Sequence, residues 1–454
     1  MEFSKQQNVI SLPRYGSIKL KTLCAGYAFA VTVAACLAGS VESSALMLVI
    51  TAMFAPLILM PETLVGPIFF CSMFDEFLLA GDGSSVSRFL VLFFIAGAAI
   101  TILQKGTIKQ ISLYFMLLIV MGVLLSFYTT QGYTSIPTSY ILNILLLITM
   151  INYTAFSFEN IPKRIYSYAI LALAFVYMLF VKNGFDSLVD GGRMSISEAV
   201  NSNELAMGLA VVMAILVSDM LQHKKHMLLN LLFIGANLIA LFFTGSRTAL
   251  IAAIVATFLL YLIHAKDKRS KRNAFFLLIL SIALLVFIYN TLQKEYPVLM
   301  ERFTAENVEE SGGTGRVDVW KHYFIYFFPQ HWIIGMGFDP QNLYYGLVSL
   351  NLEAHGAHNF IIDILARSGV VGLILYAVCI VKFFVAVAKK LRANSSLLVP
   401  MAIVITTLLN GIGENVLAGR FLWFGIGLGY MFIYSMNQEN EKEAGGNYDT
   451  GYAR

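Results

Sequence analysis

Long runs of apolar residues separated by short polar breaks fill nearly the whole chain. Many of these runs are roughly 17–25 residues long, which is the length of α-helix that crosses a bilayer. The segment 45–76 is also apolar but is interrupted at Pro61 and Glu62, and it predicts either two short spans or a re-entrant hairpin. The other runs predict membrane-spanning helices near residues 22–39, 86–103, 111–128, 139–152, 165–182, 204–221, 227–243, 247–264, 274–291, 360–387, 397–411 and 418–435.

The composition agrees with this pattern. The chain is 58% hydrophobic and 13% charged, whereas soluble domains carry about 25% charged residues. We therefore expect an all-α polytopic membrane protein with 12–14 transmembrane helices and a large extracytoplasmic loop before the third-last helix. Residues 1–435 are expected to form one transmembrane helical domain that includes the loop 292–359, and residues 436–454 a disordered tail. The first apolar run follows a basic start without a clear cleavage site, so we interpret it as a retained span.

Basic residues predict the orientation. Most of the 31 lysines and arginines fall in alternate breaks between spans, and the positive-inside rule assigns such breaks to the cytoplasm. Both termini are then cytoplasmic, and the loops 183–203 and 292–359 are extracytoplasmic. The residues that set this orientation are Lys5, Arg14, Lys19, Lys21, Lys105, Lys109, Lys163, Arg164, Lys224, Lys225, Lys266, Lys268, Arg269, Lys271, Arg272, Lys389, Lys390, Arg392, Lys442 and Arg454.

The sequence shows no pattern typical of a metal site, a cofactor site or a nucleic-acid interface. The four cysteines all lie in apolar spans and lack the spacing of metal ligands. The net charge of +4 is explained by the basic cytoplasmic loops. We expect no metal, no cofactor and no nucleic-acid partner.

Four polar residues from separate segments share the predicted extracytoplasmic face: Arg193, Arg247, Arg316 and His358. Each alone has an ordinary explanation, such as an arginine that reaches lipid headgroups or a histidine that caps a helix. As a set they are harder to explain, because this face is depleted of basic residues. Arginine offers a planar fork suited to diphosphate, and histidine a base near neutral pH. Together they suit a reaction in which a hydroxyl attacks and a phosphate-linked group leaves.

Other residues near this face form a second tier of candidates. His355 competes with His358 as the base, and Asn359 follows it directly. Arg420 and Glu414 flank the last extracytoplasmic turn, where an ion pair between them is the simpler alternative. Asp363 and Arg367 are spaced as an intrahelical ion pair, for which we expect a role in stability.

Three stretches resemble the O-antigen ligase and polymerase superfamily: SRTAL at 246–250, GRVDVW with HWIIGMGF at 315–338, and AHNFIIDILARSGVVGLILY at 357–376. The resemblance extends over roughly residues 180–430. It implies a GT-C type fold and a metal-independent, inverting glycosyltransferase that uses a glycan on undecaprenyl diphosphate. It assigns the base to His358 and the diphosphate contacts to Arg247 and Arg316, with a looser match for Arg193.

Two transferases and a transporter are consistent with these features. A polymerase would join lipid-linked repeat units of O-antigen, capsule or exopolysaccharide, and a ligase would transfer the glycan to lipid A-core or another acceptor. We favour the polymerase because the loop 183–203 is sizeable and carries its own arginine. A flippase or transporter should place ionisable residues within its spans, and these are nearly free of them. The expected partners are the lipid-linked donor, a glycan or lipid-core acceptor and membrane lipids, with a chain-length regulator and a flippase as further candidates.

Overall fold

The computed structural model describes residues 16–41, 43–79, 84–105, 113–128, 138–153, 160–183, 193–194, 201–223, 226–265, 268–304, 316–339, 341–351, 357–417 and 419–446. Within these ranges the chain is α-helical and contains no strand beyond one isolated bridge between Leu79 and Ser85. Six of the described helices are long and apolar enough to cross a membrane. The prediction of an all-α polytopic membrane protein is confirmed.

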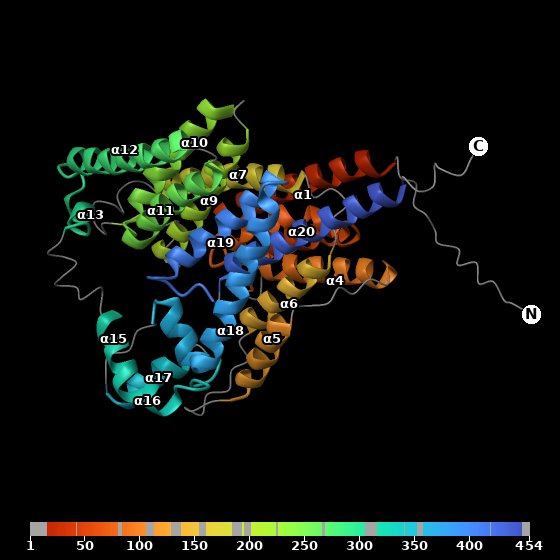
Figure 1. Ribbon diagram of the computed structural model, residues 1–454. Coiled ribbons are helices and arrows are strands. Elements are labelled where there is room, and N and C mark those ends of the chain that lie inside the picture. The colour runs from red at the N-terminus through yellow and green to blue at the C-terminus, as the bar shows by residue number, and fades with distance from the viewer. Residues whose placement is uncertain are drawn as a thin grey trace, which may run out of the picture.

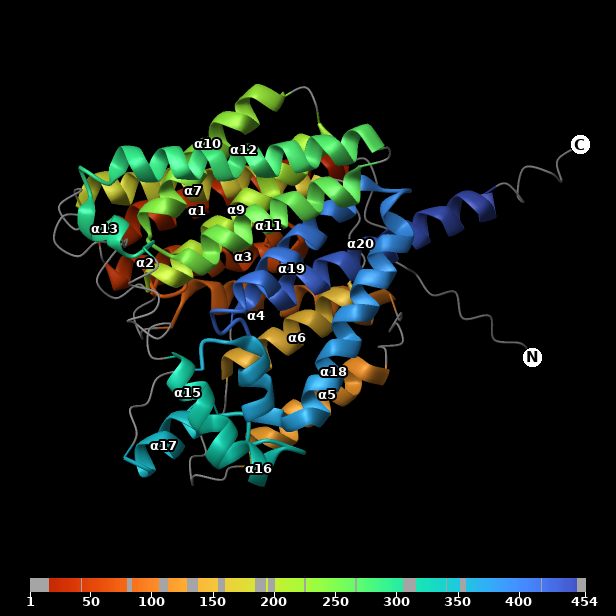
Figure 2. The ribbon, with the colours of Figure 1, turned by 60° about the vertical axis from the view of Figure 1, so that its left-hand side comes forward.

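Most of the predicted spans correspond to single helices (Figures 1 and 2). These are α1 (Gly16–Ser40), α4 (Val86–Lys105), α5 (Leu113–Ser126), α6 (Thr138–Asn152), α7 (Ile161–Asn183), α9 (Ser202–Gln222), α10 (Met227–Phe243), α11 (Arg247–His264), α12 (Lys268–Leu292), α18 (Phe360–Leu391), α19 (Leu398–Asn410) and α20 (Arg420–Gly446). Helix α1 begins and α20 ends at the same end of the bundle, on the right in Figure 1. Helix α20 also continues through residue 446, into the segment expected to be a disordered tail.

The ambiguous segment 45–76 forms two short helices, α2 (Ser44–Met53) and α3 (Val65–Met73), joined by 3₁₀ turns at Ala55–Leu59 and Pro61–Thr63. In the second turn, the Glu62 carboxylate lies 3.3 Å from the Lys21 ammonium. Lys21 lies near the N-terminal end of α1, whereas α2 begins just after the C-terminal end of α1. The turn at Glu62 therefore lies at the opposite end of α1 from the start of α2. This geometry favours two short passes over a shallow hairpin.

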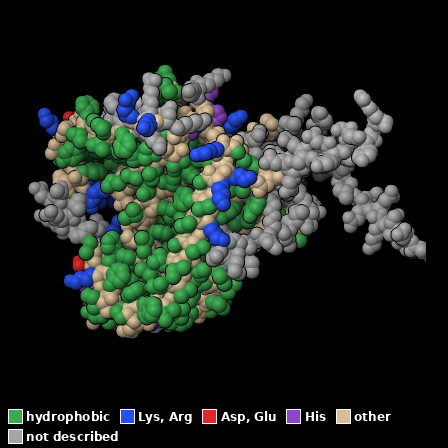
Figure 3. Space-filling model, viewed as in Figure 1, with side chains coloured by type: hydrophobic (Ala, Val, Ile, Leu, Met, Phe, Trp, Pro, Cys, Tyr) green, Lys and Arg blue, Asp and Glu red, His purple; other side chains and the backbone are tan. Residues whose placement is uncertain are grey.

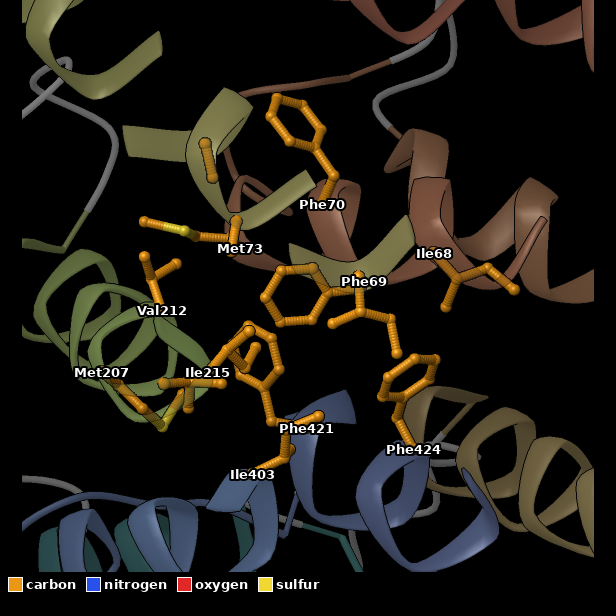
Figure 4. Close-up of a cluster of buried hydrophobic side chains, with 14 of the residues drawn as sticks. Ile68, Phe69, Phe70, Met73, Met207, Val212, Ile215, Ile403, Phe421 and Phe424 are labelled. Atoms are coloured by element: carbon orange, nitrogen blue, oxygen red, sulfur yellow. The ribbon is translucent and has the colours of Figure 1, made fainter. Parts of the chain in front are cut away.

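Helix α3 is buried at the centre of the bundle. Its Phe69 packs between helices distant in sequence, with ring centroids 5.8 Å from Phe421 and 6.3 Å from Phe424 of α20 (Figure 4). Met207 and Val212 of α9 lie on the other side of the same cluster. Helix α9 is the most enclosed of the six long spans, because its side chains contact α7, α10, α11 and α19. These central contacts fix the helix ends that carry the site.

The predicted loop 292–359 contains helices of its own: α13 (Pro297–Glu301), α15 (Arg316–His322), a π-helical turn (Tyr323–Phe327), α16 (Phe328–His331) and α17 (Gln341–Ser349). We call residues 316–351 the loop unit. Its apolar side chains, among them Val319, Tyr323 and Leu347, form a second hydrophobic core against the start of α18. The unit lies below the main bundle, next to α18 and α5 (Figure 2).

Helix α18 is broken at Gly369, and the span predicted over 360–387 is therefore not continuous. Gly369 adopts φ 63°, and a Cβ there would come within 2.2 Å of the Ile333 carbonyl oxygen. The break frees backbone groups that the loop unit satisfies: Val370 N donates to Trp332 O at 2.8 Å, and Met336 N donates to Ala366 O at 2.6 Å. The first turns of α18 thus pack with the loop unit, and only the part after Gly369 has the length of a span. The sequence prediction missed this because glycine is common within membrane helices.

Candidate functional site

The turn between α10 and α11 begins the site. Gly245 takes φ 65°, which favours glycine, and this tight reversal makes Arg247 the first residue of α11. A Cβ on Gly245 would approach side-chain atoms of both Arg193 and Arg302 to 3.3 Å. The side chains of two arginines from other loops therefore pack directly against this turn.

Arg193 and Arg302 are held around this turn by a few hydrogen bonds. Arg193 Nε donates to Thr244 O at 3.0 Å, and its Nη2 donates to Asn203 Oδ1. Arg247 Nη1 donates to the backbone oxygen of Arg302 at 3.1 Å. The Nε atom of Arg302 is buried without a hydrogen-bond partner in the described part of the chain. A buried guanidinium donor left open in this way is available to an anionic ligand.

Glu414 joins the loop unit to the turn that precedes α20. Arg316, the first residue of α15, donates from Nη2 to Glu414 Oε1 at 2.9 Å and from Nη1 to Gly413 O at 2.6 Å. The second carboxylate oxygen, Oε2, lies 3.1 Å from His358 Nδ1. One carboxylate thus orients both an arginine and the histidine that were predicted to act together.

His358 lies in a short segment that is fixed on both sides. It adopts a positive φ of 43°, and the residue before it accepts a hydrogen bond from Trp320 Nε1 at 2.7 Å. Asn359 caps α18 by accepting from the Ile361 and Ile362 N–H groups, and it donates to Ile412 O at 3.0 Å. The unusual backbone of His358 is therefore maintained by its neighbours, and it turns the imidazole toward Glu414.

These side chains surround a pocket of about 500 Å³. Figure 3 shows lysine or arginine side chains inside a hollow between the upper helices and the loop unit. His358 does not line the pocket itself but adjoins it through Glu414, and its side chain is about a third exposed. The lining residues are Arg193, Asn203, Gly245, Ser246, Arg247, Thr248, Ile251, Arg302, Arg316, Val317, Trp320, Ile412, Gly413 and Glu414.

Positive charge exceeds negative charge in this pocket. Four guanidinium groups line it, against the single carboxylate of Glu414. Burial, together with the charges of Arg302, Arg316 and Arg247 and against the opposing effect of Glu414, lowers the pKa of Arg193 to about 10. Burial, followed by the charge of Arg247, also lowers the pKa of Arg302. The pocket therefore brings together guanidinium cations that repel one another and that a multivalent anion would stabilise.

The structure brings together most of the predicted site residues but separates others. Arg193, Arg247, Arg316, His358 and Glu414 converge, and Asn359 acts as a helix cap. Arg420 pairs with Asp75 at the end of α3 rather than with Glu414, and it does not line the pocket. His355 lies outside the described residues.

Asp363 and Arg367 form the expected ion pair, with Nε and Oδ2 2.9 Å apart, and Arg367 also donates to Phe338 O at 2.9 Å. Both side chains are buried between α18 and the loop unit, away from the pocket. This position is consistent with the expected role in stability.

Sequence reasoning missed two contributors, Arg302 and Trp320. Arg302 is a basic residue in the same predicted extracytoplasmic loop as Arg316, so the signal that singled out Arg316 applied to it as well. Trp320 lines the pocket and donates a hydrogen bond to the backbone before His358. Among the described residues, no group of three or more His, Cys, Asp or Glu side chains is arranged to hold a metal ion.

A family model described as O-Antigen ligase matches residues 229–377, from the start of α10 into α18. The matched range includes Arg247, Arg302, Arg316 and His358, whereas Arg193 and Glu414 lie outside it. No curated protein matches the chain. Residues 229–377 of this helical membrane protein therefore match the O-antigen ligase domain, which supports the resemblance to the O-antigen ligase and polymerase superfamily.

Proposed function

We propose that the protein is a polysaccharide polymerase that joins undecaprenyl-diphosphate-linked repeat units at the extracytoplasmic face of the bacterial inner membrane. The observation that carries this proposal is the convergence of Arg193, Arg247, Arg302 and Arg316 on one pocket, beside a histidine that is bound to a carboxylate. A diphosphate is the multivalent anion that a lipid-linked glycan donor would bring to such a pocket. The paired N–H donors of a guanidinium group match the oxygens of a diphosphate. A partly enclosed site strengthens the attraction between these opposite charges.

His358 is the proposed general base. Its Nδ1 atom faces the carboxylate of Glu414, which favours the tautomer with the proton on Nδ1 and leaves Nε2 free to accept. The acceptor hydroxyl would lose its proton to Nε2 while its oxygen forms a bond to the anomeric carbon. The bond from that carbon to the diphosphate oxygen breaks at the same time, and the arginines stabilise the negative charge of the departing lipid diphosphate.

The arginines allow this reaction to proceed without a metal ion. In many phosphate-transferring sites a divalent cation neutralises the leaving group, and here four guanidinium groups can perform that role. We therefore expect transfer in the presence of EDTA. Activity that is lost in EDTA and restored by a divalent cation would contradict this part of the proposal.

The orientation of the site follows from the basic residues. Lys268 lies at the start of α12, whose other end leads through α13 to Arg302, and Lys389 and Lys390 lie at the end of α18, whose other end begins beside His358. By the positive-inside rule the pocket opens on the extracytoplasmic side. A lipid-linked donor carried in that leaflet could then present its diphosphate at the ends of the helices.

A ligase that transfers the glycan to lipid A-core is the second candidate, because the matched family model is described as an O-antigen ligase. Both enzymes would use the same donor chemistry and differ in the acceptor. We favour the polymerase because the loop before α9 contributes a fourth guanidinium, that of Arg193, to the pocket. Purified protein supplied with lipid-linked repeat alone should form a glycan ladder if it is a polymerase. Transfer that requires added lipid A-core would identify a ligase.

The variant that tests the mechanism is His358→Ala. We expect it to lower the rate of transfer by roughly 10²–10⁴ because the general base is lost, while binding of the lipid-linked donor is retained. His331→Ala, in α16 of the same loop, is the matched control and should retain activity. Normal transfer by His358→Ala, at equal amounts of protein, would overturn general-base catalysis by this histidine.

A further inference from the structure

The loop unit has an exposed face that is unusual for a loop in water. From residue 323 to residue 351 the sequence contains one charged residue, Asp339, and it is buried. Large apolar side chains are instead exposed along this stretch, including Phe324, Ile325, Trp332, Ile333, Tyr345 and Val348. An exposed apolar face of this kind marks a surface that is covered by another phase or molecule.

The break in α18 indicates where this face lies relative to the membrane. The 22 residues from Val370 to Leu391 would extend about 33 Å as a helix, close to the thickness of a bilayer core. This part ends at the basic pair Lys389 and Lys390, which suits one membrane boundary. The other boundary then falls near Gly369.

Hydrogen bonds place Trp332 and Ile333, which we call the tip of the loop unit, at the level of the membrane boundary near Gly369. The carbonyl oxygens of Trp332 and Ile333 accept from the N–H groups of Val370 and Val371, at 2.8 and 3.2 Å. The side chains of Trp332 and Ile333 are about half exposed, and so is Val371 on the adjacent turn of α18. The exposed tip is therefore continuous with the lipid-facing surface of a membrane span.

The polar side of the loop unit points to the same arrangement. Its exposed charges, Asp318 and Lys321, both lie on α15, the helix whose first residue, Arg316, lines the pocket. Figure 3 shows hydrophobic side chains over most of the lower surface that the loop unit forms. A segment with one apolar face, one polar face and tryptophan and tyrosine at the boundary is typical of a membrane interface.

We infer that the loop unit rests in the lipid leaflet next to the N-terminal end of α18, with its apolar face inserted among the headgroups and upper acyl chains. The partner of this surface is the bilayer itself. A second copy of the chain is the less suitable occupant, because the tip is continuous with a surface that lipid already covers. Contact with the membrane would thereby fix the position of Arg316 along the membrane normal, relative to the helices that carry the other arginines. This inference does not depend on the reaction catalysed in the pocket.

Depth-dependent fluorescence quenching in the full-length protein tests the inference. A Cys24→Ser background removes the cysteine that is not buried, and Ile333→Cys is labelled with an environment-sensitive dye in lipid nanodiscs. Asp318→Cys, on the polar side of the same unit, is the matched control. We expect nitroxide-bearing lipids to quench the dye at 333 several-fold more strongly than the dye at 318. Aqueous iodide should show the reverse order.

A label at Val348→Cys on α17 gives an independent reading of the same face, in case the change at 333 disturbs the tip. Weak quenching by lipid together with free access of iodide at both 333 and 348 would show that the face lies in water, and would overturn the inference. Protection of both labels from lipid and iodide alike would indicate a protein contact, such as a second copy, and would overturn it equally.

Discussion

Replacement of Glu414 by glutamine isolates the effect of one charge on the proposed base. In the native site, Oε1 accepts from Arg316 and Oε2 faces His358 Nδ1 at 3.1 Å. A glutamine amide has one oxygen and one NH₂ group, and Arg316 can only donate. The oxygen therefore remains with Arg316, and the NH₂ group turns toward the histidine.

This orientation would force His358 into the wrong tautomer. Nδ1 would accept a hydrogen bond from the amide, the proton would move to Nε2, and Nε2 could no longer accept the proton of the acceptor hydroxyl. Loss of the correct tautomer and of the charge that stabilises the imidazolium costs roughly 10²–10⁴ in kcat, as in hydrolases in which the equivalent aspartate becomes asparagine. Since Arg316 keeps an oxygen partner, the KM for the lipid-linked donor should change little.

Steady-state transfer from a defined lipid-linked repeat measures both constants. Glu301→Gln removes an exposed carboxylate beside Arg302 without touching His358, so it is the matched control. The double variant with His358→Ala should be no slower than His358→Ala alone, because both changes disable the same base. Near-normal kcat for Glu414→Gln, or full additivity in the double variant, would refute the coupling of these two residues.

Three further predictions address the pocket, the loop unit and the orientation. Arg302→Met should weaken donor binding by roughly 10–150-fold through loss of a charge-assisted hydrogen bond. The same change should raise the apparent Tm of the protein without donor. Burial and the charge of Arg247 lower the pKa of Arg302 on folding, so its charged form is unfavourable in the folded state at neutral pH, and a lower Tm would contradict this reasoning. Asp363→Asn should lower the apparent Tm, because it weakens a buried ion pair by about 1.5–3 kcal/mol, with transfer by the folded fraction unchanged; a selective loss of transfer would place the pair in the reaction. In intact cells, an impermeant thiol reagent should label a cysteine at 203 and leave one at 268 unlabelled, and the opposite pattern would reverse the orientation.

The sequence by itself determined that this is a helical membrane protein and where most of its helices lie. A bilayer leaves no water for backbone groups, so the length and polarity of each apolar run decide the span with little help from its neighbours. The stretches around Arg247, Arg316 and His358 were also sufficient to indicate the superfamily, because they are local motifs. The predicted orientation rests on the basic loops alone.

Only the tertiary structure decided how the site is assembled. Arg193 and Arg302 are more than 100 positions apart in sequence, yet both lie against Gly245, because packing around α9 sets the relative height of the helix ends. Glu414 was expected either to pair with Arg420 or to remain a secondary residue, and instead it connects Arg316 to His358. The break at Gly369 also depends on a tertiary contact, because the backbone there packs against the backbone of a loop more than 30 residues away in sequence. Periodicity and composition describe each segment on its own, whereas these contacts depend on which segments meet.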